Sequence, residues 1–270
     1  MPNNQVSKSH IQISQGVLRQ FSHKKKEELN GFVNVCDAVY VLSLLTGKIS
    51  EEKVATFGTQ ADYYSLNVEK ELSETIEGPF GEVTRKIRSS PNDSYSALTS
   101  GDIVAIQRYI KASIVRAPRN HNDPQVNSIA QSLGITLTPS ISVEFLLSRL
   151  DALKPFPNTG MILIKNTSPT PFVVPFNCLS IMNLERGDKI FFPFHPKFCF
   201  ALVPLEDFDK TPGPIDLATT VFETSKDVEN VNNLSIGTEL VNQKMIVGSE
   251  ENELKRIYVV YQKLLQRKIK

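Results

Sequence analysis

The chain has no tryptophan, and it contains only three cysteines and four histidines among 270 residues. Cys36, Cys178 and Cys199 are far apart, and none is part of a CxxC pair. This scatter argues against a zinc knuckle or a thioredoxin-like site, because both need closely spaced cysteines. We expect free, buried thiols in a reducing compartment. The lack of tryptophan carries no functional information.

Long hydrophobic runs are also missing. The longest run, residues 38–45, is too short to cross a bilayer and contains Ser43. The opening Met1-Pro-Asn-Asn-Gln is polar and does not resemble a secretory signal. We therefore expect a cytoplasmic protein that makes no contact with a membrane.

Neither sign of charge is in excess. Lys and Arg number 30 and Asp and Glu 29, so the formal net charge is +1. No overall field attracts nucleic acid or an anionic membrane. The basic runs Lys24-Lys25-Lys26 and Arg267-Lys268 are short and lie near acidic residues. They indicate either a solvated face or weak surface binding to nucleic acid.

Common catalytic signatures are absent as well. The chain has no HExxH, no GxSxG and no closely spaced cysteine and histidine. Thr46-Gly47-Lys48 resembles the end of a phosphate-binding loop, but Leu42 occupies the position of the loop's first glycine. The sequence therefore predicts no metal site and identifies no cofactor.

Apolar and β-branched patterns predict the secondary structure. Residues 33–39 read as a strand, and residues 40–45 either extend a hairpin or form a short buried segment. The charged residues 22–28 before them read as a solvated loop. Short strands are expected between residues 161 and 205. Amphipathic helices are expected at 66–88 with a break at Gly78-Pro79, from a cap at Thr99 or Ser100 to 116, at 125–133, 142–153 and 225–241, and from a cap at Ser249 to the end.

This order of helices, strands and helices, without regular alternation, favours an α+β fold. We expect a helix-rich single domain over residues 1–270. It would have an N-terminal β-hairpin and a small antiparallel sheet in its second half.

Two residues are candidate catalytic groups. His10 precedes a short amphipathic turn in which Leu18 and Phe21 can face a core, and its imidazole could act as a general base or a metal ligand. Its ring nitrogens could instead be bound by backbone groups. Glu77 stands at the Gly78-Pro79 break, where a carboxylate can point into a pocket; it could equally belong to a solvated face.

Arg116-Ala-Pro-Arg119 is the most distinctive local motif. Proline ends the preceding helix and fixes where the two guanidinium groups emerge, which suits a clamp for phosphate or carboxylate. The alternative is structural, because arginines near a helix C-terminus bind the free carbonyl groups there.

Taken together, these motifs resemble a bacterial family, domain of unknown function 4238. The resemblance runs over about residues 10–265. Ser14 and Ile11 stand where the family has a proline and a second histidine, and Phe176 and Cys178 stand where it has an aspartate and a proline. The matching positions are His10, Leu18, Phe21, Ser22, Ile76, Glu77, Arg116, Pro118, Arg119, Asn177, Pro193 and Pro196.

The resemblance implies one domain and adds Asn177 to the candidate ligand-binding residues, Arg116 and Arg119. The family has no established activity to carry over. Our first hypothesis is a polar pocket that binds an anionic ligand or hydrolyses a phosphodiester, with the arginines holding phosphate and His10 or Glu77 as base. The alternative is a non-catalytic binding or scaffold protein whose polar residues fix the fold. The sequence does not predict an oligomeric state.

Overall fold

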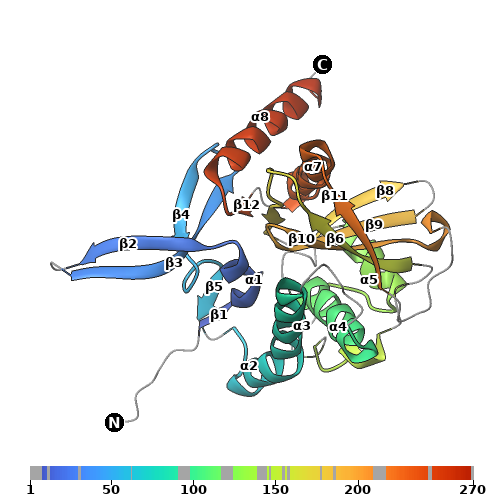
Figure 1. The fold of residues 1–270 in the computed structure, drawn as a ribbon. Coiled ribbons are helices and arrows are strands. Elements are labelled where there is room, and N and C mark those ends of the chain that lie inside the picture. Colours follow the sequence, from blue (N-terminus) through green and yellow to red (C-terminus); the bar gives the residue numbers. More distant parts are fainter. Residues whose placement is uncertain are drawn as a thin grey trace, which may run out of the picture. The chain divides into compact units, whose positions relative to one another are not determined.

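The fold was analysed in a computed structural model (Figure 1). The structure describes residues 8–10, 13–29, 32–61, 63–90, 98–116, 124–138, 145, 147–153, 156, 159–176, 178–184, 187–208, 217–242 and 245–268. The chain forms two compact units, each built from separate stretches. The first comprises Met1–Gly16, Gly58–Pro157 and Gly213–Asp216. The second comprises Val17–Phe57, Asn158–Pro212 and Leu217–Lys270.

The first unit is mainly helical. A two-stranded antiparallel sheet pairs β1 (Lys8–His10) with β5 (Thr59–Ala61). The main helical elements are α2 (Leu66–Leu72), a π-helical turn (Ser73–Glu77), α3 (Gly78–Ser89), α4 (Ser100–Arg116) and α5 (Pro124–Ser132), and a short 3-10 helix covers Leu150–Ala152. Short α1 (Gln15–Gln20) lies where the chain passes into the second unit, and the predicted core residues Leu18 and Phe21 are fully buried there.

Helix α4 begins at a reciprocal cap. The Thr99 hydroxyl accepts a hydrogen bond from the Asp102 backbone N–H at 3.3 Å, while the Asp102 carboxylate accepts one from the Thr99 N–H at 2.8 Å. This arrangement satisfies amide groups that a helix start leaves unpaired. Lys86 of α3 also binds the Asp102 carboxylate, at 2.8 Å. The two helices pack through Phe80 and Tyr109, whose rings stack 3.9 Å apart.

The second unit contains two five-stranded sheets. One has the order β11-β6-β10-β9-β8, in which β11 runs parallel to β6 and the other pairs are antiparallel. The other has the order β2-β3-β12-β7, with β4 also paired to β3. The strands of the first are β6 (Thr159–Asn166), β8 (Ser180–Leu184), β9 (Gly187–His195), β10 (Phe198–Pro204) and β11 (Leu217–Phe222). Those of the second are β2 (His23–Leu29), β3 (Phe32–Ser43), β4 (Ile49–Lys53), β7 (Val174–Pro175) and β12 (Met245–Gly248).

Two helices complete this unit. Helix α7 (Ser225–Asn242) packs on β7, β8 and β11, and α8 (Glu251–Lys268) packs on β3, β4 and β12. A short 3-10 helix, Leu205–Asp207, follows β10. Two apolar clusters lie between helices and sheets, one around Phe172 and Val228 and the other around Leu42 and Leu254.

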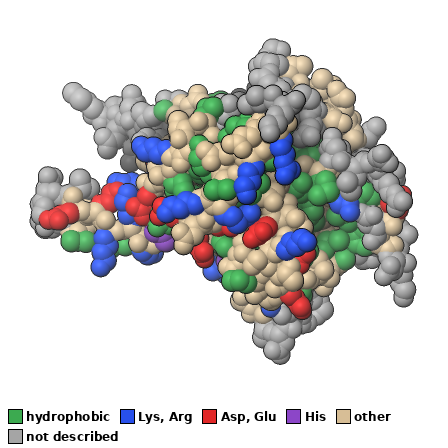
Figure 2. All heavy atoms as spheres, turned by 90° about the horizontal axis from the view of Figure 1, so that it is seen from above, with side chains coloured by type: hydrophobic (Ala, Val, Ile, Leu, Met, Phe, Trp, Pro, Cys, Tyr) green, Lys and Arg blue, Asp and Glu red, His purple; other side chains and the backbone are tan. Residues whose placement is uncertain are grey.

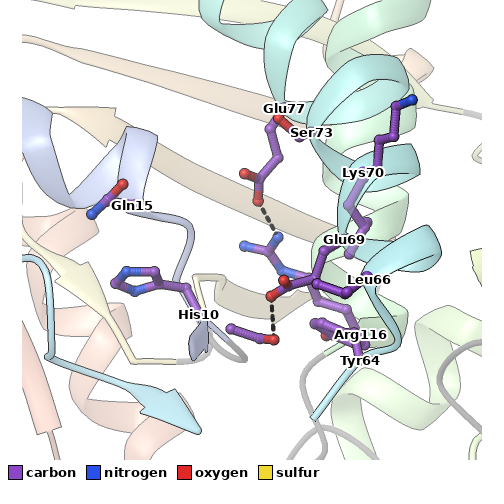
Figure 3. A pocket seen from close by; sticks show the side chains of 11 residues that line it. His10, Gln15, Tyr64, Leu66, Glu69, Lys70, Ser73, Glu77 and Arg116 are labelled. Atoms are coloured by element: carbon purple, nitrogen blue, oxygen red, sulfur yellow. Dashed lines mark hydrogen bonds and ion pairs between the residues drawn. The ribbon is translucent and has the colours of Figure 1, made fainter. Parts of the chain in front are cut away.

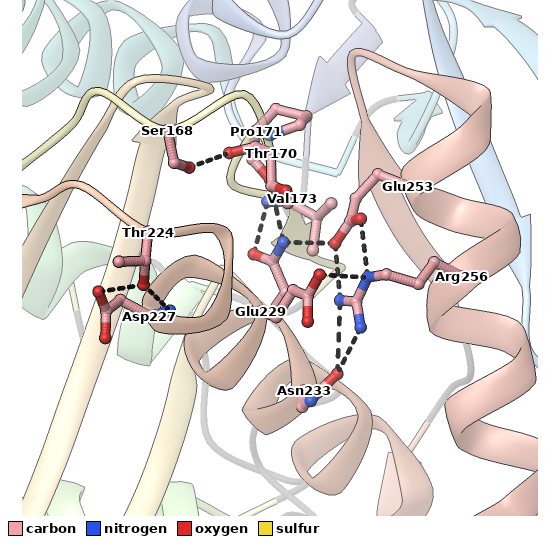
Figure 4. A network of polar contacts seen from close by, with 11 residues as sticks. Ser168, Thr170, Pro171, Val173, Thr224, Asp227, Glu229, Asn233, Glu253 and Arg256 are labelled. Atoms are coloured by element: carbon pink, nitrogen blue, oxygen red, sulfur yellow. Dashed lines mark hydrogen bonds and ion pairs between the residues drawn. The ribbon is translucent and has the colours of Figure 1, made fainter.

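A buried polar network fixes α7, α8 and the segment before β7 (Figure 4). The Asn232 amide accepts from the Val173 N–H at 3.1 Å and donates to the Pro171 carbonyl at 2.9 Å and to Glu253 at 2.7 Å. Arg256 then donates to both Glu253 oxygens, at 2.7 and 2.8 Å. Because the Asn232 bonds join separate structural elements, the network stabilises the fold.

The predicted fold class is wrong. The described residues form three sheets, and one of the larger two joins β2, β3 and β4 from the N-terminal part of the chain to β7 and β12 from its second half. One of them is mixed, because β11 is parallel to β6. The structure is therefore a mixed α+β fold, but it is no helix-rich domain with one small antiparallel sheet. The assignment of residues 1–270 to one domain stays a prediction.

The clearest local error is the charged loop predicted at residues 22–28. Most of that segment is strand β2, paired with β3 from His23 opposite Ala38 to Leu29 opposite Phe32. Of the helix predicted at 142–153, the structure describes Phe145 and residues 147–153, and within that part residues Leu150–Ala152 form a 3-10 turn instead. The helices expected at 100–116 and 125–133 are confirmed within a residue, and Gly134 ends α5 with φ +85°.

Candidate functional site

The first unit contains a pocket of about 400 Å³ (Figure 3). Side chains from β1, α2, the π-turn and the C-terminal end of α4 line it. The polar groups on which its chemistry depends are Ser9, His10, Tyr64, Glu69, Glu77 and Arg116.

The sequence Gly78-Pro79 creates the π-turn that presents Glu77. Pro79 has no N–H, so the carbonyl of Thr75 loses its usual helical partner and instead accepts a hydrogen bond from Arg108 of α4 at 3.2 Å. The Gly78 N–H bonds to the Ser73 carbonyl, five residues back. A Cβ atom at Gly78 would lie 2.8 Å from that oxygen, so only glycine fits. The predicted break is therefore a π-turn, a feature frequent at functional sites.

Arg116 lies at the C-terminal end of α4 and is almost completely buried, with 1% of its side chain exposed. Its Nη1 donates to Oε1 of Glu77 at 2.6 Å, while the Glu77 side chain is 33% exposed. The guanidinium carbon lies 5.9 Å from the centre of the Tyr109 ring. The negative end of the helix dipole adds to the stabilisation of this buried cation.

Tyr64 lines the same pocket immediately before Ser65, whose side chain caps α2. The phenol is 5% exposed, and its hydroxyl has no hydrogen-bond partner among the described residues. Burial raises the pKa of this hydroxyl far above its usual value, against the opposing effect of the nearby Arg116 charge. Tyr64 is therefore a neutral hydrogen-bond donor whose partner would have to come from the pocket.

In Figure 3, His10 lies to the left of the Arg116 guanidinium, and the Glu69 carboxylate lies below it. Glu69 accepts a hydrogen bond from Ser9, which joins β1 to α2. The imidazole of His10 points away from the Arg116–Glu77 pair, toward the side of Gln15, and Lys70 extends away from the pocket. This orientation places a titratable ring at the wall of the pocket without directing it at the buried cation.

The structure thus brings three of the five predicted site residues, His10, Glu77 and Arg116, to one pocket. Arg119 and Asn177 lie outside the described residues. Sequence reasoning missed Tyr64, because nothing local marks a tyrosine before a helix cap as functional. Within the described residues, no three His, Cys, Asp or Glu side chains are grouped so that they could hold a metal ion.

Comparison of the chain with protein-family models, with curated proteins and with solved structures finds no match. The resemblance to domain of unknown function 4238 stays a prediction. In the part of the chain that the structure describes, no helix is both long and apolar enough to cross a membrane.

Proposed function

We propose that this protein binds a small molecule with an acidic group in the pocket of the first unit. The observation that carries the proposal is the pair formed by a buried guanidinium, Arg116, and a buried, unpartnered hydroxyl, Tyr64, at one cavity of the described residues. A charged donor beside a neutral donor suits a carboxylate or phosphate oxygen. Glu77 orients the guanidinium by accepting the hydrogen bond from Nη1 of Arg116. It does not bind the Tyr64 hydroxyl, which is a second donor at the same pocket.

Binding is better supported than phosphodiester hydrolysis. Both candidate bases have geometries that disfavour the role, because Glu77 is bound to Arg116 and the His10 ring points away from that pair. A general base must reach the proton that it removes. Hydrolysis remains a prediction with a direct assay, the release of nitrophenolate from bis(4-nitrophenyl) phosphate. Turnover that is lost in both His10→Ala and Glu77→Gln would favour hydrolysis over simple binding.

A matched pair of tyrosine variants tests the binding proposal. The probes are acetate, succinate and inorganic phosphate, titrated by calorimetry and followed by thermal shift, since a ligand of the folded state raises the melting temperature. Tyr64→Phe removes one hydroxyl, and we expect it to weaken binding by about three- to tenfold, the effect of one neutral hydrogen bond. Tyr63→Phe is the control, because Tyr63 packs edge-on against Tyr64 at 4.8 Å but does not line the pocket.

The proposal fails if none of the three probes binds, or if Tyr64→Phe and Tyr63→Phe bind them as tightly as the wild type. The non-catalytic scaffold alternative rests on a specific observation too. The Arg116–Glu77 pair joins α4 to the π-turn and so contributes to the fold whether or not a ligand binds. On that alternative, Arg116 substitutions change stability while the probes never bind.

A further inference from the structure

The outer part of hairpin β2–β3 is a two-stranded ribbon. Strand β2 pairs with residues 32–38 of β3, whereas β4 and β12 join β3 only at residues 38–43. Among the described residues, the ribbon between Lys24 and Asp37 therefore has no third strand. Two-stranded ribbons are only marginally stable in water, and a third or fourth strand is usually needed.

Nothing in the described chain covers one face of this ribbon. Val33 and Val35, which lie opposite Glu28 and Lys26, are 65% and 58% exposed. The side chains of Lys24, Lys26 and Glu28 on this face are accessible to solvent as well. Figure 2 shows acidic and basic side chains intermingled over the hairpin.

The edge strand β2 is complementary in charge to itself. Its sequence is His23-Lys-Lys-Lys-Glu-Glu-Leu29. If two copies pair antiparallel about a two-fold axis at Lys26, each Lys24 lies opposite Glu28 of the other copy. Each Lys25 likewise lies opposite Glu27. Opposite charges placed directly across an antiparallel pair are stabilising.

Neighbouring registers have less of this complementarity. A two-fold axis at Lys25 would place Lys24 opposite Lys26. An axis at Glu27 would keep only the pair of Lys26 with Glu28, because Lys25 would then lie opposite Leu29. If the axis instead lay between two residues, the pairing would shift by one residue, and side chains on opposite faces of the sheet would lie opposite one another. A two-fold axis perpendicular to the sheet forbids such a pairing. The Lys26 register is thus the one with the most attractive contacts, four against two in the Glu27 register, and its only like-charged contact is between the two Lys26 side chains at the axis.

We propose that β2 is a self-association edge, on which a second copy of this chain pairs antiparallel in the Lys26 register. Two ribbons then become one four-stranded sheet. Within each chain, Lys25 lies 3.3 Å from Glu51 and Glu27 lies 2.5 Å from Lys53, so the partner extends an existing ladder of alternating charges. Lys24 and Glu28 are the positions for a test, because both lie on the uncovered face of the ribbon. Lys24 also forms an ion pair with Asp37, opposite it on β3, at 2.7 Å, and 72% of its side chain remains exposed.

Charge reversal at these two positions separates the proposal from other kinds of association. In the Lys24→Glu dimer, residue 24 of each copy faces Glu28 of the other, so two contacts between carboxylates replace the two attractive pairs. In the Glu28→Lys dimer, two contacts between ammonium groups replace them. We expect sedimentation velocity over a concentration series to show a wild-type dimer that each single variant weakens about tenfold or more.

Two combinations should restore the dimer. An equimolar mixture of the two single variants should associate again, because the carboxylates of the first variant at positions 24 and 28 then face the ammonium groups of the second. The double variant Lys24→Glu/Glu28→Lys should also associate more tightly than either single variant. It keeps each pair between the two copies attractive, although it loses the ion pair between Lys24 and Asp37 within each chain.

Circular dichroism establishes that each variant remains folded, so that a lost dimer is not a lost fold. The wild-type dimer should also weaken with added salt, since its charged pairs are exposed. A wild type that stays monomeric at every concentration overturns the proposal. So does a dimer that survives both single substitutions, or a mixture of the single variants that fails to associate.

Discussion

The strongest structural prediction concerns the ion pair in the pocket. Glu77→Ala removes the carboxylate that Nη1 of Arg116 contacts at 2.6 Å. The Arg116 side chain, which is 1% exposed, then loses this partner. Breaking a fully buried pair in this way costs about 3–5 kcal/mol. Because the Glu77 side chain is 33% exposed, water reaches this pair and reduces the cost. We expect a loss of about 2 kcal/mol in the free energy of unfolding.

Removing the cation as well should recover part of this loss. Arg116→Met keeps an apolar stem but removes the charge. The double variant Glu77→Ala/Arg116→Met therefore contains no unpaired cation in the pocket. We expect the double variant to be more stable than the sum of the two single effects predicts, by about 1 kcal/mol or more.

Urea unfolding is the suitable assay, followed by circular dichroism and tyrosine fluorescence because the chain has no tryptophan. Glu74→Ala is the matched control, since Glu74 lies on the same turn with an exposed side chain and should cost less than about 0.5 kcal/mol. The reasoning is refuted if Glu77→Ala costs no more than Glu74→Ala, or if the single effects add in the double variant.

Other predictions test the folding argument. Burial of Asp102 alone would raise the pKa of its carboxyl group, but hydrogen bonds from Lys86 and Thr99 outweigh this effect and lower the pKa. The ionised carboxylate therefore adds to the free energy of unfolding above the unfolded pKa of about 4, and this addition is lost as pH falls through the lower folded pKa. Asp102→Asn should accordingly flatten the acid limb of a stability-versus-pH curve. Gly47 has φ +70° and a Cβ there would overlap the Tyr258 ring, so Gly47→Ala should lower the thermal midpoint, whereas Gly81→Ala, in a helix with open space at its Cβ, should raise stability by up to about 1 kcal/mol. Asn232→Ala should cost about 2–4 kcal/mol in chemical denaturation, because it leaves buried groups of Pro171, Val173 and Glu253 unsatisfied; a cost near zero would show that the network is dispensable.

The helices of the first unit were predictable because their signals are local. The apolar stripe of α4, its cap at Thr99 and its end at Arg116 all lie within one segment of sequence. Gly78-Pro79 predicted a break for the same reason. The exact form of the break was not predictable, since the π-turn depends on Arg108 of another helix reaching the carbonyl of Thr75.

The strands were harder to predict because their stability depends on distant partners. Strand β2 carries lysine and glutamate rather than apolar residues, and its pairing with β3 decides its conformation. Strands β1 and β12 have only three and four residues, and each pairs with a segment far away in sequence. Such short segments give too little periodicity for a prediction.

The candidate site was predictable in part. His10, Glu77 and Arg116 were chosen for chemistry that a pocket needs, and they do line one pocket. Their roles depend on orientation, which the sequence does not contain. The direction of the His10 ring and the burial of Tyr64 both result from the packing of β1, α2 and α4.

The most direct test of the proposed function is the NMR signal of the Arg116 side chain during a ligand titration. The Nε–H resonance, assigned by its loss in Arg116→Met, is followed as succinate or inorganic phosphate is added. Binding in the pocket predicts a saturable shift of this resonance, with weaker affinity in Tyr64→Phe and unchanged affinity in Tyr63→Phe. If the Arg116 resonance stays in place while other signals move, the ligand binds elsewhere and the proposed function is wrong.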